Sequence, residues 1–321
     1  MAHEAASGPG PIGRLAPPDA ARITQRTAGL AVAMAGVLIA IKAWAWFVSG
    51  SVAMLASLAD SGLDLAASLF TLWAVTYAAA PPDPEHRYGH GKAESFAGLF
   101  QALLVGASAT FVAIEAFDRF QNPQPIQQGG LAIAVMVISI GLTLALLVAQ
   151  SRAVNATGSV ATSGDRAHYA ADLGANLAVI LGVAASAFLG WPLADPLIGL
   201  GVALWLAWSA LEVARGATNQ LMDRELPADA RERIVALAEA ADPRVSVHQL
   251  RTRAAGPIIH IQFHLDLPPT MSLAEAHQVM VACETRILAE FPGADVLIHP
   301  DPIGVAEPHG GDFFGETIRE S

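Results

Sequence analysis

Long apolar segments alternate with short polar connections along the first two-thirds of the chain. A helix needs roughly 20 mostly apolar residues to cross the hydrocarbon core of a bilayer. The segments that reach or approach this length lie near residues 28–48, 52–79, 96–117, 130–149, 167–190 and 196–211. The last segment is short, but Pro196 at its start suits the first turn of a helix. The pattern predicts a polytopic α-helical membrane protein with six transmembrane helices.

The pattern changes after Met222, where apolar and polar residues become mixed. Helix-like and strand-like stretches follow in the order α-β-β-α-β, over residues 227–240, 245–253, 259–267, 272–291 and 295–299. This order is typical of a small α+β domain with both helices on one face of a sheet. The expected organisation is a disordered arm over 1–25, a transmembrane domain over 26–216, a small domain over 217–303 and a disordered tail over 304–321.

Composition supports the membrane interpretation and narrows the chemistry. Hydrophobic residues make up 53% of the 321 residues and charged residues only 15%, whereas soluble proteins carry about 25% charged residues. The formal net charge of −11 argues against nucleic acid as a partner, because such a partner selects a basic surface. The lone cysteine, Cys283, cannot form an internal disulfide or a thiolate metal cluster and is expected to be a packing residue. A metal site would therefore use histidine and carboxylate ligands.

The basic residues of the short connections predict the orientation in the membrane, since lysine and arginine favour the cytoplasmic side. One side of the predicted bundle carries Arg14, Arg22, Arg26, Arg87, Lys92, Arg152, Arg166, Arg215 and Arg224. The other side carries only Arg119, near the loop at Asn122. The first 25 residues lack the apolar core of a cleavable signal. Both termini are therefore expected in the cytoplasm.

Ionisable side chains interrupt two of the apolar segments in the same pattern. Asp60 and Asp64 lie in the second segment, and His168 and Asp172 lie near the start of the fifth. Each pair is spaced i, i+4, which places both side chains on one helix face. Two facing helices would present three carboxylates and one imidazole, a ligand set that binds zinc without thiolates. The alternative is a structural polar patch that only joins helices.

The charges of these four residues suggest a mechanism. Three carboxylates and a neutral imidazole carry −3, so one divalent ion leaves −1. An empty site with such crowded like charges favours protonation, and ligands must lose protons to bind a metal. Metal and protons would then compete for one site, which gives an antiport cycle if the site faces one side at a time. His168, with a reference pKa of about 6.5, is the favoured proton carrier.

These residues carry a resemblance to a known family. The DxxxD and HxxxD pairs and the loop motif Gly89-His90-Gly91-Lys92-Ala93-Glu94-Ser95 resemble the cation diffusion facilitator family, in particular its bacterial ferrous-iron and zinc efflux branch. The resemblance extends from about Ile23 to Pro302. It implies a homodimer in the inner membrane, with a metallochaperone-like cytoplasmic domain. It also implies proton-coupled export by alternating access, of zinc or alternatively cadmium or ferrous iron, through Asp60, Asp64, His168 and Asp172.

The resemblance implies further sites. The loop site would comprise Asp83, His86 and His90, the cytoplasmic site His248, His264, His277, His299 and Asp301, and an interdomain salt bridge Lys92 with Asp223. Zinc would then also be a structural or regulatory ion. The alternatives are a solvated turn for the loop set and independent interfacial charges for the salt bridge. Five of the ten histidines fall between His248 and His299, which favours a metal site there; the resemblance leaves His260 outside it, or at most at its periphery.

Other classes of function fit less well. No H-E-x-x-H or G-x-S-x-G motif occurs, so an enzyme is not expected. A channel would not need tight four-residue binding, and a sensor would not need carboxylates in the bilayer. The histidine at position 168 favours zinc, cadmium or ferrous iron, because an all-oxygen site would favour harder ions such as manganese.

Overall fold

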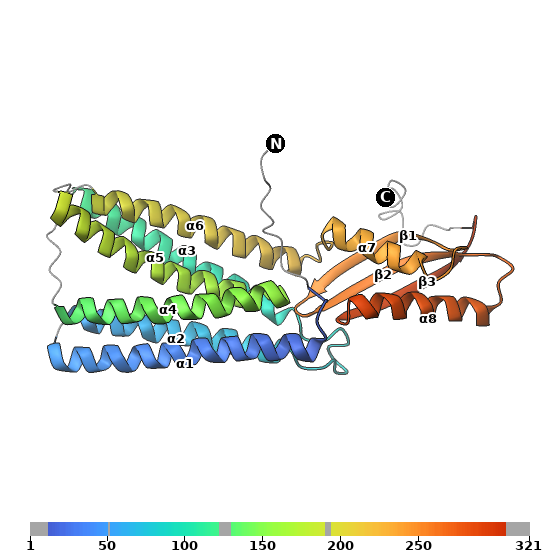
Figure 1. The fold of residues 1–321 in the computed structure, drawn as a ribbon, viewed down its shortest axis with the longest axis horizontal. Helices are drawn as coiled ribbons and strands as arrows, with labels where there is room; N and C mark the ends of the chain where they lie inside the picture. Colours follow the sequence, from blue (N-terminus) through green and yellow to red (C-terminus); the bar gives the residue numbers. More distant parts are fainter. Residues whose placement is uncertain (1–11, 51, 122–129, 190–193, 306–321) are drawn as a thin grey trace.

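A computed structural model describes residues 12–50, 52–121, 130–189 and 194–305. Long helices form a bundle at one end of the molecule, and a small α+β domain forms the other end (Figure 1). The bundle helices within these ranges are α1 (Pro17–Ser49), α2 (Val52–Ala78), α3 (Ala93–Gln121), α4 (Gly130–Thr157), α5 (Val160–Leu189) and α6 (Ala194–Leu221). The prediction of a polytopic helical region followed by a small mixed domain is confirmed.

Five of the bundle helices in the described ranges are long and apolar enough to cross a membrane, namely α1, α2, α3, α4 and α6. Helix α5 is the predicted span that does not meet this criterion. The first half of α5 carries Asp165, Arg166, His168 and Asp172, which lower its apolar content. It nevertheless packs against α3, α4 and α6 within the bundle. The helix that departs most from an apolar span is thus the one that carries half of the predicted transport site.

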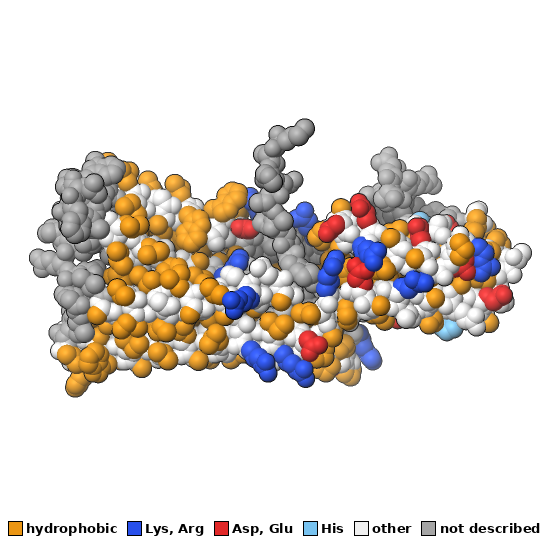
Figure 2. All heavy atoms as spheres, in the orientation of Figure 1, with side chains coloured by type: hydrophobic (Ala, Val, Ile, Leu, Met, Phe, Trp, Pro, Cys, Tyr) orange, Lys and Arg blue, Asp and Glu red, His pale blue; other side chains and the backbone are white. Residues whose placement is uncertain are grey.

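The surface of the bundle is apolar, and its charges gather at one end (Figure 2). Large side chains point outward from several helices, including Phe47, Leu103 and Phe111, which are 84%, 72% and 70% exposed. Such a continuous apolar surface suits contact with lipid. Lysine and arginine side chains cluster where the bundle meets the small domain (Figure 2). The basic side of the bundle is therefore the side that faces the small domain.

Two helices extend beyond the predicted limits. Helix α1 begins at Pro17, so residues 17–25, predicted as part of a disordered arm, are helical and that prediction is wrong there. Proline suits a first helical turn, and Asp19 in that turn pairs with Arg22 at 3.2 Å. Helix α6 ends at Leu221, beyond the predicted domain limit at residue 216. Hydropathy finds the apolar core of a helix, but not its polar extension into water.

The segment before α1 packs against the small domain and corrects the predicted arm further. The carbonyl of Gly13 accepts a hydrogen bond from the Gly293 amide at 2.9 Å, and Ile12 packs on the domain core. Gly13 has a φ of 79°, and a Cβ there would lie 2.7 Å from Ile259, so only glycine fits. The guanidinium of Arg14 lies 5.4 Å from the ring centre of Phe291. This segment joins α1 directly to the small domain.

Parts of the predicted organisation lie outside the described residues. They are residues 1–11 of the arm, the loop at Asn122 within 122–129, residues 190–193 and residues 306–321 of the tail. At the start of the predicted tail, the Val305 amide donates to the Pro302 carbonyl at 3.0 Å.

The small domain has the predicted element order. Its elements are α7 (Ala228–Glu239), β1 (Ser246–Ala255), β2 (Ile258–Leu267), α8 (Leu273–Glu290) and β3 (Ala294–Pro302). Among the described residues the strands form one sheet in the order β1-β2-β3, with β1 antiparallel and β3 parallel to β2. The register places His248 opposite His264 and His264 opposite His299, so three histidines form a row across the sheet.

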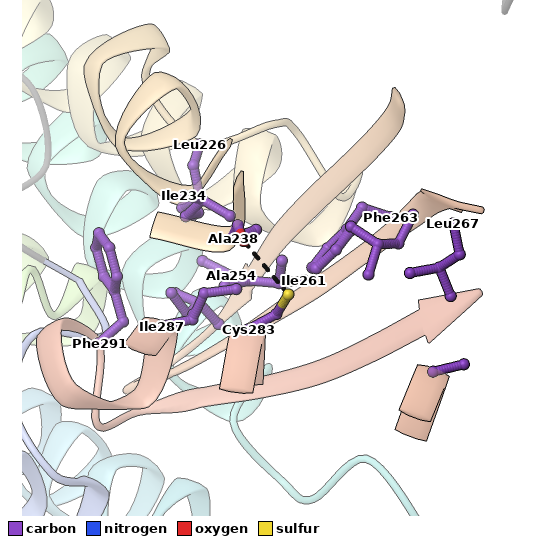
Figure 3. Close-up of a cluster of buried hydrophobic side chains, with 13 residues drawn as sticks. Leu226, Ile234, Ala238, Ala254, Ile261, Phe263, Leu267, Cys283, Ile287 and Phe291 are labelled. Carbon is purple, nitrogen blue, oxygen red and sulfur yellow. Dashed lines mark hydrogen bonds between the residues drawn. The ribbon is translucent and has the colours of Figure 1, made fainter. Parts of the chain in front are cut away.

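Helices α7 and α8 enclose the core of the small domain against one face of this sheet (Figure 3). Ile234 of α7, Phe263 of β2 and Ile287 of α8 are almost fully buried there. Cys283 lies between the two helices, and its thiol donates to the Ala238 carbonyl at 3.3 Å (Figure 3). Burial raises the pKa of this thiol to about 11. Cys283 is therefore a core residue, as expected.

Candidate metal centres

Three predicted transport residues meet inside the helix bundle. Asp64 of α2 and His168 and Asp172 of α5 each offer a ligand atom, and these atoms lie within 4.8 Å of one another. His168 Nε2 is 3.1 Å from Asp64 Oδ1 and 3.9 Å from Asp172 Oδ2. His168 Nδ1 is buried and has no hydrogen-bond partner in the described part of the chain. The i, i+4 spacing on α5 therefore does aim both ligands at α2.

Asp60 departs from the predicted four-ligand arrangement. It lies one helical turn before Asp64 on α2, but its side chain is exposed and outside the 4.8 Å group. The same i, i+4 spacing brings His168 and Asp172 together on α5, so spacing on one helix does not by itself decide whether both side chains reach the cluster. Three of the four predicted residues therefore lie together in the described structure, and the fourth, Asp60, stays a prediction as a ligand.

A buried polar network adjoins this cluster and was missed from the sequence. The Asp165 carboxylate accepts hydrogen bonds from Gln150 Nε2 at 2.7 Å and Gln101 Nε2 at 3.2 Å. Ser68 Oγ donates to the same carboxylate at 3.3 Å. These contacts join α2, α3, α4 and α5 around the turn that presents His168. The available signal was Asp165 itself, an ionisable residue three positions before His168 and two positions before the predicted span that starts at 167, because ionisable residues at membrane depth mark functional regions.

A second missed residue is Lys42 of α1. It is the one charged residue between positions 27 and 59 of the sequence. Its ammonium group donates to Ser61 Oγ at 2.6 Å and to the Ser57 carbonyl at 3.2 Å, both on α2. Residues 28–48 were predicted as a span from their apolar residues, and no role was predicted for Lys42 within them.

The loop between α2 and α3 brings together its three predicted ligands. Ligand atoms of Asp83, His86 and His90 lie within 4.8 Å of one another. His90 Nε2 is 3.2 Å from Asp83 Oδ2, and His86 Nδ1 is 3.3 Å from Asp83 Oδ1. The His90 side chain is buried against Tyr77, with ring centres 4.6 Å apart. The loop is therefore an ordered cluster of donors and not only a solvated turn.

Backbone hydrogen bonds set the position and charge of Asp83. The amides of His86 and Glu85 donate to its carboxylate at 2.6 and 2.9 Å. The amide of His86 is the main cause that holds the pKa of Asp83 below its usual value, so the group is ionised near neutral pH. Pro84 lies within this loop, and the ligand atoms of Asp83, His86 and His90 converge around it in sequence.

The start of α3 docks on the small domain through close backbone contact. A Cβ at Gly91 would lie 2.0 Å from the Ala255 carbonyl oxygen, so a larger residue would separate the loop from the β1-β2 turn. Lys92 Nζ lies 3.0 Å from Asp223 Oδ1, which is the predicted interdomain pair. Arg253 of β1 approaches the same carboxylate at 3.4 Å and lies 4.9 Å from the ring centre of Tyr88. Asp223 thus forms an ion pair with Lys92, at the start of α3, and with Arg253 of the small domain.

The electrostatic state of Asp223 follows from these neighbours. Burial would raise the pKa of its carboxyl, but the hydrogen bond from Lys92 and the charges of Lys92 and Arg253 outweigh burial. The pKa of Asp223 therefore lies below its usual value. Arg253 was not identified from the sequence as a partner in this contact.

The row of histidines on the sheet forms the third cluster. Ligand atoms of His248, His264 and Asp301 lie within 4.8 Å of one another. Asp301 contacts His264 Nδ1 at 2.9 Å, His248 Nε2 at 3.3 Å and His299 Nε2 at 3.1 Å. Burial would raise the pKa of Asp301, but the hydrogen bond from His264 and the three imidazoles lower it below its usual value. One buried carboxylate therefore organises three predicted ligands.

The remaining candidates of the small domain lie apart from this carboxylate or at its edge. His277 is exposed on α8 and is not part of the cluster within the described chain, so its role as a ligand stays a prediction. His260 pairs with Asp295 at 2.9 Å and lies outside the cluster. Asp266, 3.5 Å from His248 Nε2, adjoins the cluster and was absent from the predicted set.

Comparison with known proteins supports the interpretation of both parts. The family model described as the cation efflux transmembrane domain matches residues 29–222. The model described as the cation efflux protein, cytoplasmic domain, matches residues 226–303. Together these matches cover the bundle and the small domain.

Similar full-length proteins share the same description. The cation-efflux pump FieF of Klebsiella pneumoniae is 39% identical over 293 residues, covering 91% of this chain and 97% of that protein. The cation-efflux pump FieF of Shewanella oneidensis is 43% identical over 275 residues, covering 85% and 92%. A solved structure of the putative zinc transporter CzrB in its zinc form is 33% identical, covers 27% of this chain and 99% of its own, and has a TM-score of 0.25.

Proposed function

Because the chain belongs to the cation efflux, or cation diffusion facilitator, family, we propose that it exports a divalent transition metal, foremost zinc, in exchange for protons. Efflux of a cation and residence in a membrane follow from the family. The proposal adds three points: zinc as the main substrate, exchange of the metal for protons, and passage of the ion through the helix bundle. Its strongest support is the meeting of Asp64, His168 and Asp172 between α2 and α5 inside the helix bundle.

The ligand set favours zinc among divalent ions. Zinc accepts imidazole and carboxylate ligands in tetrahedral sites, whereas magnesium and manganese prefer oxygen ligands. Asp64, His168 and Asp172 supply one nitrogen and two carboxylates within 4.8 Å. Asp60, one turn away on α2, supplies the fourth ligand when its side chain turns inward around a bound ion. Cadmium and ferrous iron, which also accept imidazole, are the alternative substrates.

The same two atoms can hold either a proton or a metal. His168 Nε2 and Asp64 Oδ1 lie 3.1 Å apart, a hydrogen-bonding distance, and a hydrogen bond between them uses a proton on one of the two atoms. A metal ion bound to both atoms must displace that proton, because a ligand atom cannot hold a proton and a metal together. Metal binding therefore releases protons, and protonation releases metal. Exchange of the two across the membrane requires that the site open to each side in turn.

The other clusters support the direction of transport. The basic end of the bundle adjoins the small domain (Figure 2), and basic loops favour the cytoplasmic side. We place both termini and the small domain in the cytoplasm of a bacterial cell, with the bundle in the inner membrane. Metal would reach the loop site at Asp83, His86 and His90 before it enters the bundle.

The small domain is proposed to form a homodimer that responds to metal. A zinc ion at His248, His264, His299 and Asp301 would stabilise the domain and bias the bundle toward one conformation. Lys92, Asp223 and Arg253 provide the contact through which the domain and the bundle influence each other.

Zinc uptake into proteoliposomes under an imposed pH gradient tests the proposal. Wild-type protein should accumulate zinc only with the gradient, and Asp172→Ala should lose this uptake. Glu212→Ala removes an exposed carboxylate of α6 outside the cluster and should retain uptake. Zinc flux that does not depend on the pH gradient would indicate a channel. Absence of zinc flux in the wild type would count against transport of zinc.

A further inference from the structure

Lys42 of α1 introduces a positive charge beside the transport cluster. It is the single charged residue within residues 27–49, the apolar part of a helix that is long enough to cross the membrane. An ammonium group is costly to place in the apolar part of a membrane-spanning helix, so its presence requires a compensating interaction.

The side chain of Lys42 is held against the turn of α2 that carries the transport carboxylates. Its Nζ donates to Ser61 Oγ at 2.6 Å and to the Ser57 carbonyl at 3.2 Å. Ser61 is fully buried and follows Asp60 directly. The partners of the ammonium are therefore neutral oxygens, and the carboxylates remain available as ligands.

The negative groups that act on this ammonium are the proposed metal ligands themselves. Burial disfavours the Lys42 ammonium, and the charges of Asp64, Asp172 and Asp60 oppose that effect. The attraction is mutual, so Lys42 offsets part of their combined charge. Because these groups lie in or beside a partly buried cluster, the offset is screened less than it would be between fully exposed charges.

The charge balance of the site changes once Lys42 is counted. Three ionised carboxylates and the neutral His168 carry −3, and the ammonium brings the sum to −2. One divalent ion then makes the occupied site neutral, where the four ligands alone would leave −1. A neutral site costs less to keep in an apolar environment than a charged one.

We propose that Lys42 is a fixed internal counter-ion of the transport site. Its positive charge makes the metal-loaded site neutral and weakens metal binding enough for the metal to be released. It does not touch the metal, and it acts through the field at Asp60, Asp64 and Asp172. This proposal rests on the proposed transport function of the same site. It predicts that removing the charge improves binding at the expense of turnover.

Lys42→Gln is the informative variant, because its amide can still donate to Ser61 while the charge is lost. We expect its KM for zinc in proteoliposomes to fall about tenfold, with a similar fall in maximal rate as release slows. The KM for cadmium should fall by the same factor, since the repulsion depends on charge and not on the identity of the ion. Lys42→Arg retains the charge, so its KM should stay above that of Lys42→Gln.

Equilibrium dialysis of zinc against the purified protein provides a second readout that does not require transport. The zinc that wild type binds and Asp172→Ala does not bind belongs to the transport site, and Lys42→Gln should hold this fraction more tightly. An unchanged or weaker affinity would overturn the role of Lys42, as would equal affinities of Lys42→Gln and Lys42→Arg. If Asp172→Ala binds as much zinc as wild type, the proposed transport site itself fails, and the role of Lys42 fails with it.

Discussion

The transmembrane cluster and the cytoplasmic cluster use the same two types of side chain but hold them differently. In the cytoplasmic cluster, the carboxylate of Asp301 contacts His248, His264 and His299 at 2.9–3.3 Å. In the transmembrane cluster, one contact of 3.1 Å joins Asp64 to His168, and Asp172 lies 3.9 Å from the same imidazole. The first arrangement is closed around its carboxylate, and the second is open.

The difference follows from the elements that carry the ligands. Strands β1, β2 and β3 fix their side chains through backbone pairing, and the cross-strand register sets the histidine row. Helices α2 and α5 are not hydrogen-bonded to each other through their backbones, so the distance between their ligands changes whenever the helices move. A site on a sheet suits lasting occupancy, and a site between helices suits binding followed by release. The predictions below separate these two behaviours.

The largest effect is expected for Asp64→Ala. This change removes the carboxylate that contacts His168 from α2 and leaves α5 without its partner ligand. We expect kcat/KM for zinc transport to fall about 100-fold or more. Uptake assays in proteoliposomes, with Glu212→Ala as the control on an exposed carboxylate, would measure it. Transport within threefold of wild type would place the route elsewhere.

A change of ligand type at His168 should alter metal preference rather than abolish transport. His168→Asp replaces the imidazole with oxygen ligands, which favour harder ions. We expect the ratio of zinc to manganese kcat/KM to fall about tenfold or more. Competition between the two ions in the same assay reads this ratio directly. An unchanged ratio would contradict the assignment of His168 as a ligand.

A smaller effect is expected in the cytoplasmic cluster. Asp301→Ala removes the carboxylate shared by three histidines, so metal binding in the small domain and dimer affinity should both fall. Under the proposed role, in which the domain regulates transport but does not carry the ion, transport should fall only about fivefold. His277→Ala tests whether the exposed histidine of α8 belongs to the same site. Equal dimer affinity and rate in wild type and Asp301→Ala would contradict the regulatory role.

The smallest effect is expected in the pH dependence of stability that arises from Asp223, where the bundle meets the small domain. The pKa of Asp223 is depressed in the folded protein, so its stabilising contribution is present above the unfolded value of about 3.9 and is lost as pH falls through the folded value. Below about pH 4 the melting temperature of wild type should decline more steeply than that of Asp223→Asn. Near neutral pH the variant should lose about 0.5–1 kcal/mol, since the pair is partly exposed. If the melting temperatures of wild type and Asp223→Asn changed identically with pH, the contact between the bundle and the small domain would not depend on this carboxylate.

The helical spans and the element order of the small domain could be predicted from the sequence because each has a strong period. Residues 52–79 and 96–117 are predominantly apolar over the length of a membrane span, and the alternation over 259–267 matches strand β2. The polar extensions of α1 and α6 could not be found this way, since residues 17–25 and 212–221 lack an apolar run. Their helical state depends on local propensity and on contact with the small domain.

The ligand pairs could be predicted from i, i+4 spacing, but their meeting could not. Spacing gives the face of a helix and not the neighbour that the face contacts, so Asp60 was expected beside Asp64 and is instead outside the cluster. Lys42 and Asp165 were missed because each is a single charge without a partner four residues away. Their contacts with Ser61, Gln101 and Gln150 come from other helices and depend on the packed bundle.

The most direct test of transport through the bundle is a cryo-electron-microscopy map of the zinc-loaded protein in lipid nanodiscs. We expect density for an ion between α2 and α5, about 2.0–2.2 Å from the ligand atoms of Asp64, His168 and Asp172. We also expect the Asp60 side chain to be turned inward toward this ion. That density should vanish in Asp172→Ala while ions in the loop and the small domain remain. Zinc in the loop and small-domain clusters but none between α2 and α5 would contradict it.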